Sequence, residues 1–321
     1  MTVAARIAVV MVNYGAADFI IAHMAKTLAA IEPFENATVY IIDNASPGGD
    51  DLLKLQAYAD QPEAQGRVVV IDSGANLGFA GGNNCAFKTF GEARPDYVFF
   101  LNPDAYPEPD AVTLLAETLA KNPDAAIAAP RILNEAGETE ISYFQFPSVL
   151  SQFSSESELS LFQDRTGWRV LDLDAAPETV ETDWVSGAAF LLRMDAADAP
   201  PMDDGYFLYF EETDMMRSLS EKKWRTLLAP RAAVTHIGGL TTGADADAKR
   251  LPSHWYASWR RYFVKHFGRS GAIAAAALKL SGYGAYRIKL ALHGAKPRRP
   301  EYYMSDFLRY AVWPILTKGR D

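Results

Sequence analysis

The tripeptide Asn102-Pro103-Asp104 carries two oxygen-bearing side chains directly after an apolar run at 97–101. Pro103 fixes its own φ and pushes Asn102 toward an extended conformation, so the two side chains lie at i and i+2 on the same side of the chain. Oxygen donors held in this way suit Mg²⁺ or Mn²⁺, with substrate phosphates completing the coordination. The alternative is an Asx turn that opens a helix, because a proline-rich stretch and a helical pattern at 111–121 follow.

Three carboxylates lie within four positions, at Glu211, Glu212 and Asp214, directly after the apolar run 207–210. Carboxylates crowded together are costly unless they are solvated, metal-bound or needed to take a proton. We therefore expect one of them to be a general base. At most one of Glu211 and Glu212 can face a pocket, because consecutive side chains on a helix point in different directions. The alternative is a helix amino terminus, where the macrodipole favours acids.

Three more segments place polar groups after apolar runs. Asp43 can accept a hydrogen bond from a ring N–H or a ribose hydroxyl, while Asn44 beside it forms an Asx-type turn. The glycine-rich segment 76–84 can offer backbone N–H groups to a diphosphate, although its glycine spacing is not that of the dinucleotide fingerprint. His236, which precedes a glycine turn, is either a structural histidine or an additional metal ligand.

The first hundred residues alternate between apolar strands and amphipathic helices, which predicts an α/β fold with a parallel sheet. The expected strands are 7–12, 39–42, 68–71 and 97–101, and the expected helices are 19–31, 51–59 and 81–90. The carboxyl ends of parallel strands share one edge, so the polar groups that follow these four strands would lie on one rim. They are Asn13, Asp43-Asn44, residues 72–84 and Asn102 with Asp104. A nucleotide pocket explains these polar ends more economically than a separate turn at each one.

The rest of the chain is less regular. The pattern predicts strands at 125–129, 184–192, 207–210, 226–228 and 232–236, and a helix from 211 to 223. Residues 134–182, polar and partly rich in Ser and Glu, are typical of loops and short strands. Residues 249–321 have a helical pattern, with breaks at Gly282, Gly284, Pro297 and Pro300. We therefore divide the chain into a sheet domain, 1–248, and a helical region, 249–321.

The composition is that of an ordinary globular protein. The chain has 321 residues, 49% hydrophobic and 22% charged, which supports one large domain or two smaller ones. Its one cysteine, Cys85, excludes an internal disulfide, and the amino terminus lacks the pattern of a signal peptide, so we expect a cytoplasmic location. A membrane span is not expected, because one needs a run of about 18 apolar residues.

Charge is divided unequally along the chain. Residues 1–248 carry 16 Lys and Arg against 37 Asp and Glu, whereas residues 249–321 carry 15 against 3. The acidic part argues against nucleic acid as a partner, and the basic, aromatic-rich tail suits peripheral contact with an anionic membrane on its cytoplasmic face. The alternative is a solvated helical face whose aromatic residues pack on the body. These aromatic residues are Trp255, Tyr256, Trp259, Tyr262, Phe263, Phe267, Tyr283, Tyr286, Tyr302, Tyr303 and Trp313.

Seven motifs, taken in order, resemble the family-2 glycosyltransferases, and among these the bacterial rhamnosyltransferases, over residues 6–240. The resemblance implies a GT-A fold, the nucleotide-diphospho-sugar transferase fold with a mostly parallel sheet flanked by helices. It also implies inverting transfer of a sugar from a nucleotide donor to an acceptor hydroxyl, with a divalent metal. The motifs are Val12-Asn13-Tyr14, Ile42-Asp43-Asn44, residues 76–84, residues 101–104, residues 184–188, residues 209–214 and His236.

The resemblance further implies a role for each motif. Asp104 would be a metal ligand, because Asn102-Pro103-Asp104 occupies the place of the family's DXD motif, and His236 would contact the metal or the diphosphate. The nucleotide-binding residues would be Asn13, Asp43, Asn44, Asn76, Gly78, Phe79, Gly82, Asn83 and Asn102, and the cleft for donor sugar and acceptor would be lined by Trp184, Gly187 and Ala188.

Two positions depart from the family pattern. The family usually has Glu-Asp where this chain has Glu211-Glu212, so Glu212 replaces the expected aspartate base. Glutamate reaches one methylene further, so either the backbone lies farther back or Asp214 takes over. Asn102 stands in place of the first aspartate of the metal motif, which lowers the charge of the site and implies weaker metal binding.

The resemblance favours dTDP-rhamnose as donor, with a UDP-hexose or UDP-galactofuranose as alternatives. The acceptor would be a glycan or a lipid-linked molecule in cell-surface polysaccharide or glycolipid synthesis. The nearest rival activity is that of a sugar nucleotidyltransferase, but no glycine-rich, lysine-bearing loop directly follows the first strand. The rival of another class is a nucleotide-sugar-binding protein that has lost its base.

Overall fold

The computed structural model describes residues 3–91, 94–159, 173, 178–198, 200–238 and 250–317. The chain divides into two compact units. The sheet unit comprises Met1–Phe144, Leu171–Asp204 and Glu211–Gly243, and the helical unit comprises Gln145–Val170, Gly205–Phe210 and Ala244–Asp321. The sequence analysis placed its boundary at residue 248 and left both 145–170 and 205–210 with the sheet domain.

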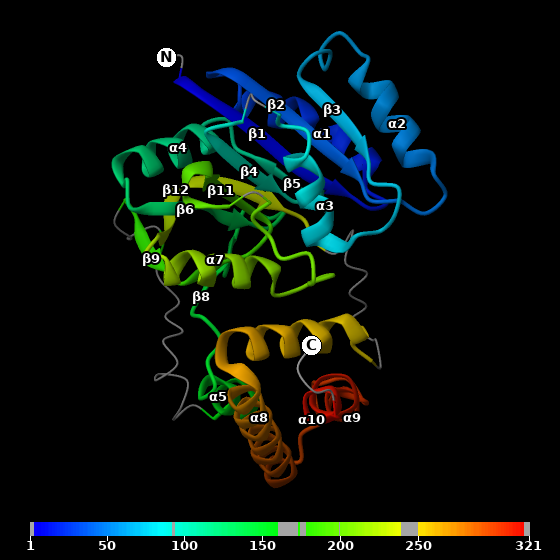
Figure 1. The fold of residues 1–321 in the computed structure, drawn as a ribbon, viewed down its shortest axis with the longest axis vertical. Helices are drawn as coiled ribbons and strands as arrows, with labels where there is room; N and C mark the ends of the chain where they lie inside the picture. The colour runs from blue at the N-terminus through cyan, green and yellow to red at the C-terminus, as the bar shows by residue number, and fades with distance from the viewer. Residues whose placement is uncertain are drawn as a thin grey trace. The chain divides into compact units, whose positions relative to one another are not determined.

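The sheet unit is built from short strands and the helices that connect them (Figure 1). Its strands are β1 (Val3–Asn13), β2 (Phe34–Asp43), β3 (Val68–Asp72), β4 (Tyr97–Leu101), β5 (Ala105–Pro107), β6 (Ala125–Leu133), β7 (Thr139–Glu140), β8 (Tyr143–Phe144), β9 (Val180–Thr182), β10 (Trp184–Val185), β11 (Ala189–Arg193) and β12 (Arg225–His236). Its helices are α1 (Ala17–Ala30), α2 (Asp50–Ala59), α3 (Gly78–Phe87), α4 (Ala111–Lys121), the short 3₁₀ helix η1 (Met194–Ala196) and α7 (Glu211–Glu221).

Ten strands form one mixed sheet, and β8 and β10 pair separately. The main path runs β3-β2-β1-β4-β11-β6-β12-β5, with β7 beside β6 and β9 beside β12. Strand β1 pairs in parallel with β2 and β4, and β2 with β3. The carboxyl ends of these strands therefore lie at one edge of the sheet, as the sequence predicted. We call this edge the rim.

Apolar periodicity accounts for this part of the fold. In α1 the residues Ile20, Met24 and Leu28 recur every four positions and are buried in the main core. The apolar run of β4 is also buried, since neighbouring strands flank it on both sides and side chains cover its faces. The GT-A expectation of a mostly parallel sheet flanked by helices agrees with this arrangement.

Antiparallel strands bring further residues to the rim. Strand β11 runs against β4, with Ala189 opposite Leu101, and β5 runs against β12, with Ala105 opposite His236. Because β11 begins and β12 ends where β4 ends, the turn before Ala189 and the side chain of His236 both lie beside the Asn102-Pro103-Asp104 segment. The chain reaches β5 only by reversing direction at that tripeptide.

Two predictions placed the strand boundaries wrongly. Residues 184–192 form two strands, β10 and β11, separated by a turn at Gly187, so this glycine lies at the rim and not within a strand. Residues 226–228 and 232–236 belong to one strand, β12, whose pairing with β6 is irregular around Pro230. Proline lacks the N–H that would continue the ladder, so the irregularity has a local cause.

The predicted strand at 207–210 is wrong. Tyr209 and Phe210 both have a φ of 71°, in the left-handed region that is costly for residues other than glycine. The ring of Phe210 packs 5.4 Å from the ring of Tyr262, which belongs to the same unit. Packing within the helical unit outweighs the β propensity of this aromatic segment.

The helical unit also departs from one prediction. It contains α5 (Ser151–Ser157), α8 (Ser253–His293), α9 (Tyr303–Phe307), the π-helical turn η2 (Leu308–Val312) and α10 (Trp313–Thr317). Helix α8 continues through Gly282 and Gly284, where breaks were expected, and bends at Gly268, whose φ is 67°. A Cβ on Gly282 would lie 2.6 Å from the carbonyl oxygen of Phe153, so this glycine lets α5 approach α8 closely.

The aromatic residues of the basic tail mostly form the core of the helical unit. Tyr256, Trp259, Tyr262 and Phe263 are buried together with aromatic residues of α9. They pack on one another, so these side chains do not face a membrane as one reading of the sequence expected. Trp313 and Tyr302 are exceptions, with 64% and 37% of their surface exposed. None of the described helices is long and apolar enough to span a bilayer.

Candidate active site

Asn13, at the end of β1, organises one side of the rim. Its Nδ2 donates to Asp43 Oδ1 (2.8 Å), Ser46 Oγ (2.9 Å) and Asp51 Oδ2 (3.1 Å), and its Oδ1 accepts from the N–H of Ala16 (2.9 Å). Ser46 Oγ in turn donates to Asp43 Oδ1 at 2.6 Å. Asn13 is completely buried, so it positions Asp43 and the start of α1. The sequence analysis treated Asp51 only as the start of a helix and missed its place in this network.

The glycine-rich loop is fixed by two asparagines. Asn44 Nδ2 donates to Asn76 Oδ1 and to the carbonyl oxygen of Gly78, both at 3.1 Å. The N–H of Leu77 donates to Asn44 Oδ1, and the N–H of Gly78 donates to Asn76 Oδ1, each at 3.0 Å. Both of these backbone N–H groups therefore have a side-chain partner, Asn44 for Leu77 and Asn76 for Gly78. Asn76 itself is exposed.

Helix α3 begins at this loop and packs closely on β1. A Cβ on Gly82 would lie 2.8 Å from Val12 Cγ1, so only glycine lets the helix approach the strand at this point. Asn83 is buried and donates from Nδ2 to the carbonyl oxygen of Phe79 at 2.9 Å. Of these two residues, both predicted to border the nucleotide, Gly82 allows α3 to pack on β1, and Asn83 bonds within the first turns of α3.

Asp104, Asn102 and His236 meet at the end of β4. Asp104 Oδ1 lies 3.1 Å from His236 Nε2, and Asn102 Nδ2 lies 3.4 Å from the same nitrogen. Asp104 is 2% exposed, and its Oδ1 has no hydrogen bond to any described residue. The N–H of Ile237 donates to the carbonyl oxygen of Asp104 at 3.0 Å, which joins the two segments through the backbone. The sequence-predicted metal ligands are therefore neighbours.

Gly187 lies where three parts of the site meet. A Cβ on Gly187 would lie 3.6 Å from the ring of Phe79 and 3.7 Å from Glu212 Oε1. The next residue, Ala188, accepts a hydrogen bond from the N–H of Asn102 at 2.9 Å. The turn between β10 and β11 thus connects the glycine-rich loop, the carboxylates of α7 and the Asn102–Asp104 segment.

Trp184 is placed by the small sheet that precedes this turn. Its ring stacks on Phe144 with centroids 4.5 Å apart, and the backbone pairs with the same residue across β8 and β10. The N–H of Ser186 donates to the carbonyl oxygen of Ser142 at 2.8 Å. The tryptophan therefore has its ring against Phe144, while Gly187 and Ala188 make the contacts to the other site residues.

Glu212 is the carboxylate of α7 that contacts this junction. Burial raises the pKa of its carboxyl above the usual value of 4.5, while hydrogen bonds from its own N–H and from those of Gly187 and Thr213 oppose the rise. Its Oε2 is buried without a hydrogen-bond partner among the described residues. Glu211 and Asp214 are buried as well, and both have interactions of their own. A carboxylate with a raised pKa and an unused oxygen is suited to accept a proton.

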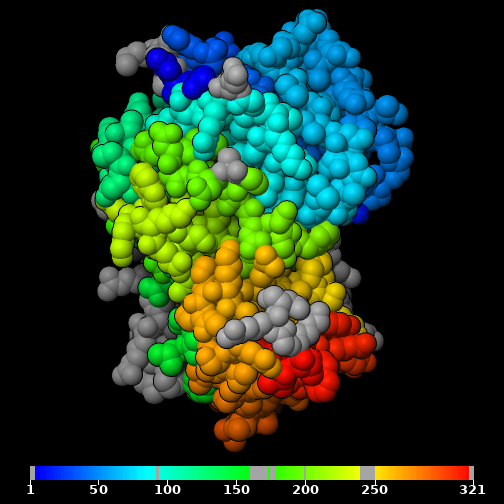
Figure 2. Space-filling model, viewed as in Figure 1, coloured from blue at the N-terminus to red at the C-terminus, as the bar shows by residue number. Residues whose placement is uncertain are grey.

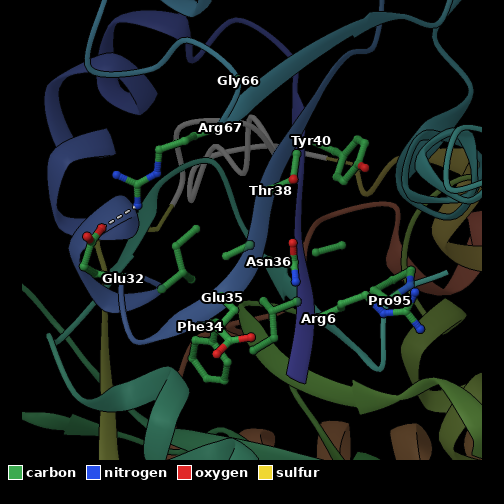
Figure 3. Close-up of a pocket in the computed structure, with 14 residues that line it drawn as sticks. Arg6, Glu32, Phe34, Glu35, Asn36, Thr38, Tyr40, Gly66, Arg67 and Pro95 are labelled. Carbon is green, nitrogen blue, oxygen red and sulfur yellow. Dashed lines mark hydrogen bonds and ion pairs between the residues drawn. The ribbon is translucent and has the colours of Figure 1, made fainter. Parts of the chain in front are cut away.

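A cavity of about 640 Å³ lies at the opposite end of the same strands (Figure 3). It is lined by the beginnings of β1 and β2 and by Arg67, whose guanidinium is paired with Glu32 at 2.9 Å. The site described above is at the carboxyl ends of these strands, where ligands bind in α/β sheets. The candidate site at the rim is therefore separate from this cavity.

Comparison with known proteins shows the family of this chain. The model of glycosyl transferase family 2 matches residues 8–175. The chain belongs to glycosyl transferase family 2. Two proteins named N-acetylglucosaminyl-diphospho-decaprenol L-rhamnosyltransferase, from Mycobacterium tuberculosis strains CDC 1551 / Oshkosh and ATCC 25618 / H37Rv, are each 26% identical to it over 259 residues. The aligned region covers 77% of this glycosyltransferase and 81% of each relative.

Solved structures share the GT-A fold of this glycosyltransferase. The mannosyltransferase PcManGT from Pyrobaculum calidifontis, in complex with GDP-Man and Mn²⁺, matches 99% of the chain with a TM-score of 0.54 and 14% identity, over 89% of its own length. GalNAc-T7 with UDP, GalNAc and Mn²⁺ matches 98% of the chain with a TM-score of 0.55 and 14% identity, over 58% of its own length. At this identity the likeness supports the fold alone.

Proposed function

We propose that this glycosyltransferase moves a rhamnosyl group from dTDP-rhamnose to a hydroxyl of a lipid-linked or glycan acceptor, with inversion at the anomeric carbon. The observation that carries the proposal is the state of Glu212. Its Oε2 is buried and unused, its pKa is raised, and its Oε1 lies beside the Gly187 turn that leads to Asn102. A carboxylate with a raised pKa and one oxygen without a hydrogen-bond partner among the described residues is suited to proton transfer, while the backbone N–H groups of Gly187 and Thr213 hold it in place.

In the proposed reaction, Glu212 takes the proton of the acceptor hydroxyl as that oxygen attacks the anomeric carbon. The bond between the anomeric carbon and the diphosphate oxygen breaks, and the nucleoside diphosphate leaves with the electron pair. One base suffices for this displacement, since the leaving diphosphate needs no proton. Asp43, held by Asn13 and Ser46, would bind the nucleoside, and the Asn44-fixed loop would border it.

A divalent metal fits the residues at the end of β4. The buried Asp104 Oδ1 lacks a hydrogen bond, and His236 Nε2 is 3.1 Å away, so a carboxylate oxygen and an imidazole nitrogen lie close together. Among the described residues no group of three or more His, Cys, Asp or Glu side chains could hold a metal, so the diphosphate and water would complete the coordination. When bound, Mg²⁺ or Mn²⁺ would neutralise charge on the leaving diphosphate.

The rhamnosyl donor is proposed from the two mycobacterial relatives, whose name includes L-rhamnosyltransferase. That name also describes a diphospho-decaprenol, which supports a lipid-linked acceptor. UDP-hexose and UDP-galactofuranose remain the alternative donors, and the acceptor places the enzyme in cell-surface polysaccharide or glycolipid synthesis at the cytoplasmic side of the membrane.

The test is a donor panel with purified enzyme, Mn²⁺ and a polyprenyl-diphosphate-linked sugar acceptor. We expect dTDP release that depends on both dTDP-rhamnose and the acceptor, and product with the inverted anomeric configuration by NMR. Faster turnover with a UDP-sugar than with dTDP-rhamnose would show that the UDP-sugar is the preferred donor and would overturn the proposed one. Binding of a nucleotide sugar without turnover for any donor, together with wild-type affinity in Glu212→Gln, would instead favour a non-catalytic binding protein.

A further inference from the structure

Two apolar patches of the helical unit are exposed to solvent. The first, which we call the α8 tip, contains Ile288 and Leu292, which are 65% and 79% exposed. These residues are four apart in α8, so they share one face of the helix. Arg287 is exposed next to Ile288, and Lys296 is exposed just beyond the helix.

The second patch, which we call the α10 face, is built on η2 and α10. Leu308, Trp313 and Leu316 are 44%, 64% and 51% exposed. A π-helical turn contains more residues than an α-helical turn, so Leu308 and Trp313, five apart, lie near one face, and Leu316 follows one α-helical turn later. Arg309 is exposed beside them, and Arg269 donates to the carbonyl oxygen of Leu316 at 2.7 Å.

The charge of the surrounding chain is almost entirely positive. Residues 250–317 contain 12 Lys and Arg but only two carboxylates, Glu301 and Asp306. Asp306 is buried and paired with Arg250 at 2.5 Å, so it contributes little to the surface. Figure 2 shows much of this surface, with α8 in orange and α9 to α10 in red. Glu156 and Glu158 of the same unit pair with Lys279 and Arg299, whereas Arg287, Lys296 and Arg309 are exposed beside the two patches. Exposed apolar side chains beside exposed cations are the combination that binds an anionic lipid surface.

We propose that the α8 tip and the α10 face dock this protein on an anionic lipid bilayer. Trp313 supplies an aromatic ring of the kind that sits at the headgroup level, and Ile288, Leu292, Leu308 and Leu316 supply aliphatic surface that enters the acyl boundary. The basic residues beside them pair with lipid phosphates. Scattered single apolar residues would need no such partner, but here they occur in two sets, each beside exposed cations.

The occupant is a lipid surface and not a second copy of this chain. A second copy would bring another basic surface against this one, and like charges oppose that contact. The docking proposal rests on the proposed function in one respect: docking on the bilayer gives the enzyme access to a lipid-linked acceptor. Lipid binding is measured without turnover, so failure of the docking and failure of the transferase proposal are distinguishable.

The experiment is sedimentation with vesicles of phosphatidylcholine alone or of equal parts phosphatidylcholine and phosphatidylglycerol. The full chain is compared with Ile288→Ser/Leu292→Ser and with Trp313→Ser/Leu316→Ser. The control is Leu53→Ser, because Leu53 in α2 is 65% exposed, as Ile288 is, but lies in the acidic sheet unit. We expect the wild type and the control to bind anionic vesicles at least about tenfold better than neutral ones, and 0.5 M NaCl to weaken the binding.

Each double variant should lower the partition onto anionic vesicles by at least about fivefold, while circular dichroism and turnover of a short-chain, water-soluble acceptor stay at wild-type levels. Equal binding to neutral vesicles would overturn the proposal, as would unchanged partition in both double variants. Light scattering that shows a dimer which dissociates in either double variant would assign the patches to a second copy and would also overturn it.

Discussion

The carboxylates on the two sides of the rim differ in their hydrogen bonding. At the ends of β1 and β2, Asp43 accepts hydrogen bonds from Asn13 and Ser46, so its oxygens have partners before any substrate arrives. At the ends of β4 and β12 and the start of α7, Asp104 Oδ1 and Glu212 Oε2 are buried without hydrogen bonds to described residues. Burying a polar atom without a hydrogen bond costs free energy, and this cost applies most clearly to Glu212 Oε2, because Asp104 Oδ1 has His236 Nε2 3.1 Å away.

This difference in hydrogen bonding distinguishes a carboxylate that holds the structure in place from carboxylates that we assign to the reaction. A carboxylate whose oxygens already accept hydrogen bonds keeps its position, which suits the recognition of a fixed nucleoside. An unsaturated, buried carboxylate can gain a proton or a cation, and the raised pKa of Glu212 has this cause. Substitutions on the two sides should therefore have opposite effects on stability and turnover.

The largest effect is expected from Glu212→Gln. The amide keeps the shape and can still accept the backbone hydrogen bonds, but it cannot take a proton. Loss of a general base typically costs 10²- to 10⁴-fold, so we expect a fall in kcat of about 10³-fold. Glu211→Gln and Asp214→Asn are the matched controls, and a larger fall in Asp214→Asn than in Glu212→Gln would move the base to that residue.

The next effect concerns the metal. Asp104→Asn should raise the Mn²⁺ concentration for half-maximal turnover by about 100-fold, because a carboxylate ligand is lost. Asn102→Asp is the matched variant in the opposite direction. It adds a carboxylate beside His236 and should lower that concentration. Titration of turnover with Mn²⁺ measures both, and equal half-maximal concentrations in wild type and Asp104→Asn would exclude Asp104 as a ligand.

Substitutions on the side of the rim around Asp43 should change the free energy of unfolding. Asn13→Ala removes donors to Asp43, Ser46 and Asp51 and should lower the free energy of unfolding by about 3 kcal/mol, measured by urea denaturation. Asn83→Ala removes the hydrogen bond from Nδ2 to the carbonyl oxygen of Phe79 and should cost about 1 kcal/mol. Equal losses of stability in the two variants would show that the hydrogen bonds of Asn13 stabilise the fold no more than the single bond of Asn83.

A glycine on the same side tests the packing of α3 on β1. Gly82→Ala would place a methyl group 2.8 Å from Val12 Cγ1 and should cost about 2 kcal/mol of stability. Gly284→Ala, in α8, has open space around the new Cβ and should stabilise by about 0.5 kcal/mol, because alanine favours helix. Denaturation midpoints check both, and a neutral Gly82→Ala would mean that the strand end can move.

The smallest effect is a gain in stability from removing the base. The folded-state pKa of Glu212 is raised, so ionisation of Glu212 lowers the stability of the folded state as the pH rises from the unfolded pKa through the folded pKa. The penalty is absent below the unfolded value near 4.5 and grows as the pH rises through the folded pKa. Glu212→Gln should therefore raise Tm at pH 7 by about 2 °C, and the difference should vanish near pH 4. A lower Tm at pH 7 would contradict this.

Much of the fold and the approximate site could be predicted from sequence, because both depend on local patterns. Alternating apolar strands and helices predicted the parallel part of the sheet, and polar strand ends predicted the rim. The reversal at Gly187 and the course of 207–210 were not predictable, since they depend on packing with distant residues. The sequence also could not reveal that the oxygens of Asp43 accept hydrogen bonds while Glu212 Oε2 accepts none. The hydrogen bonds around Asp43 join side chains from separate elements, as the bond from Asn13 to Asp51 does, and only the folded structure sets these pairs.

The central claim is that the rim divides into a saturated scaffold and unsaturated reactive carboxylates. The most direct test measures kcat at 25 °C and the free energy of unfolding at pH 7 for both Glu212→Gln and Asn13→Ala. We predict that Glu212→Gln loses about 10³-fold in kcat with no loss of stability, while Asn13→Ala loses about 3 kcal/mol and keeps kcat within about tenfold. Near-wild-type kcat in Glu212→Gln, or a loss of stability as large as that of Asn13→Ala, would contradict the claim.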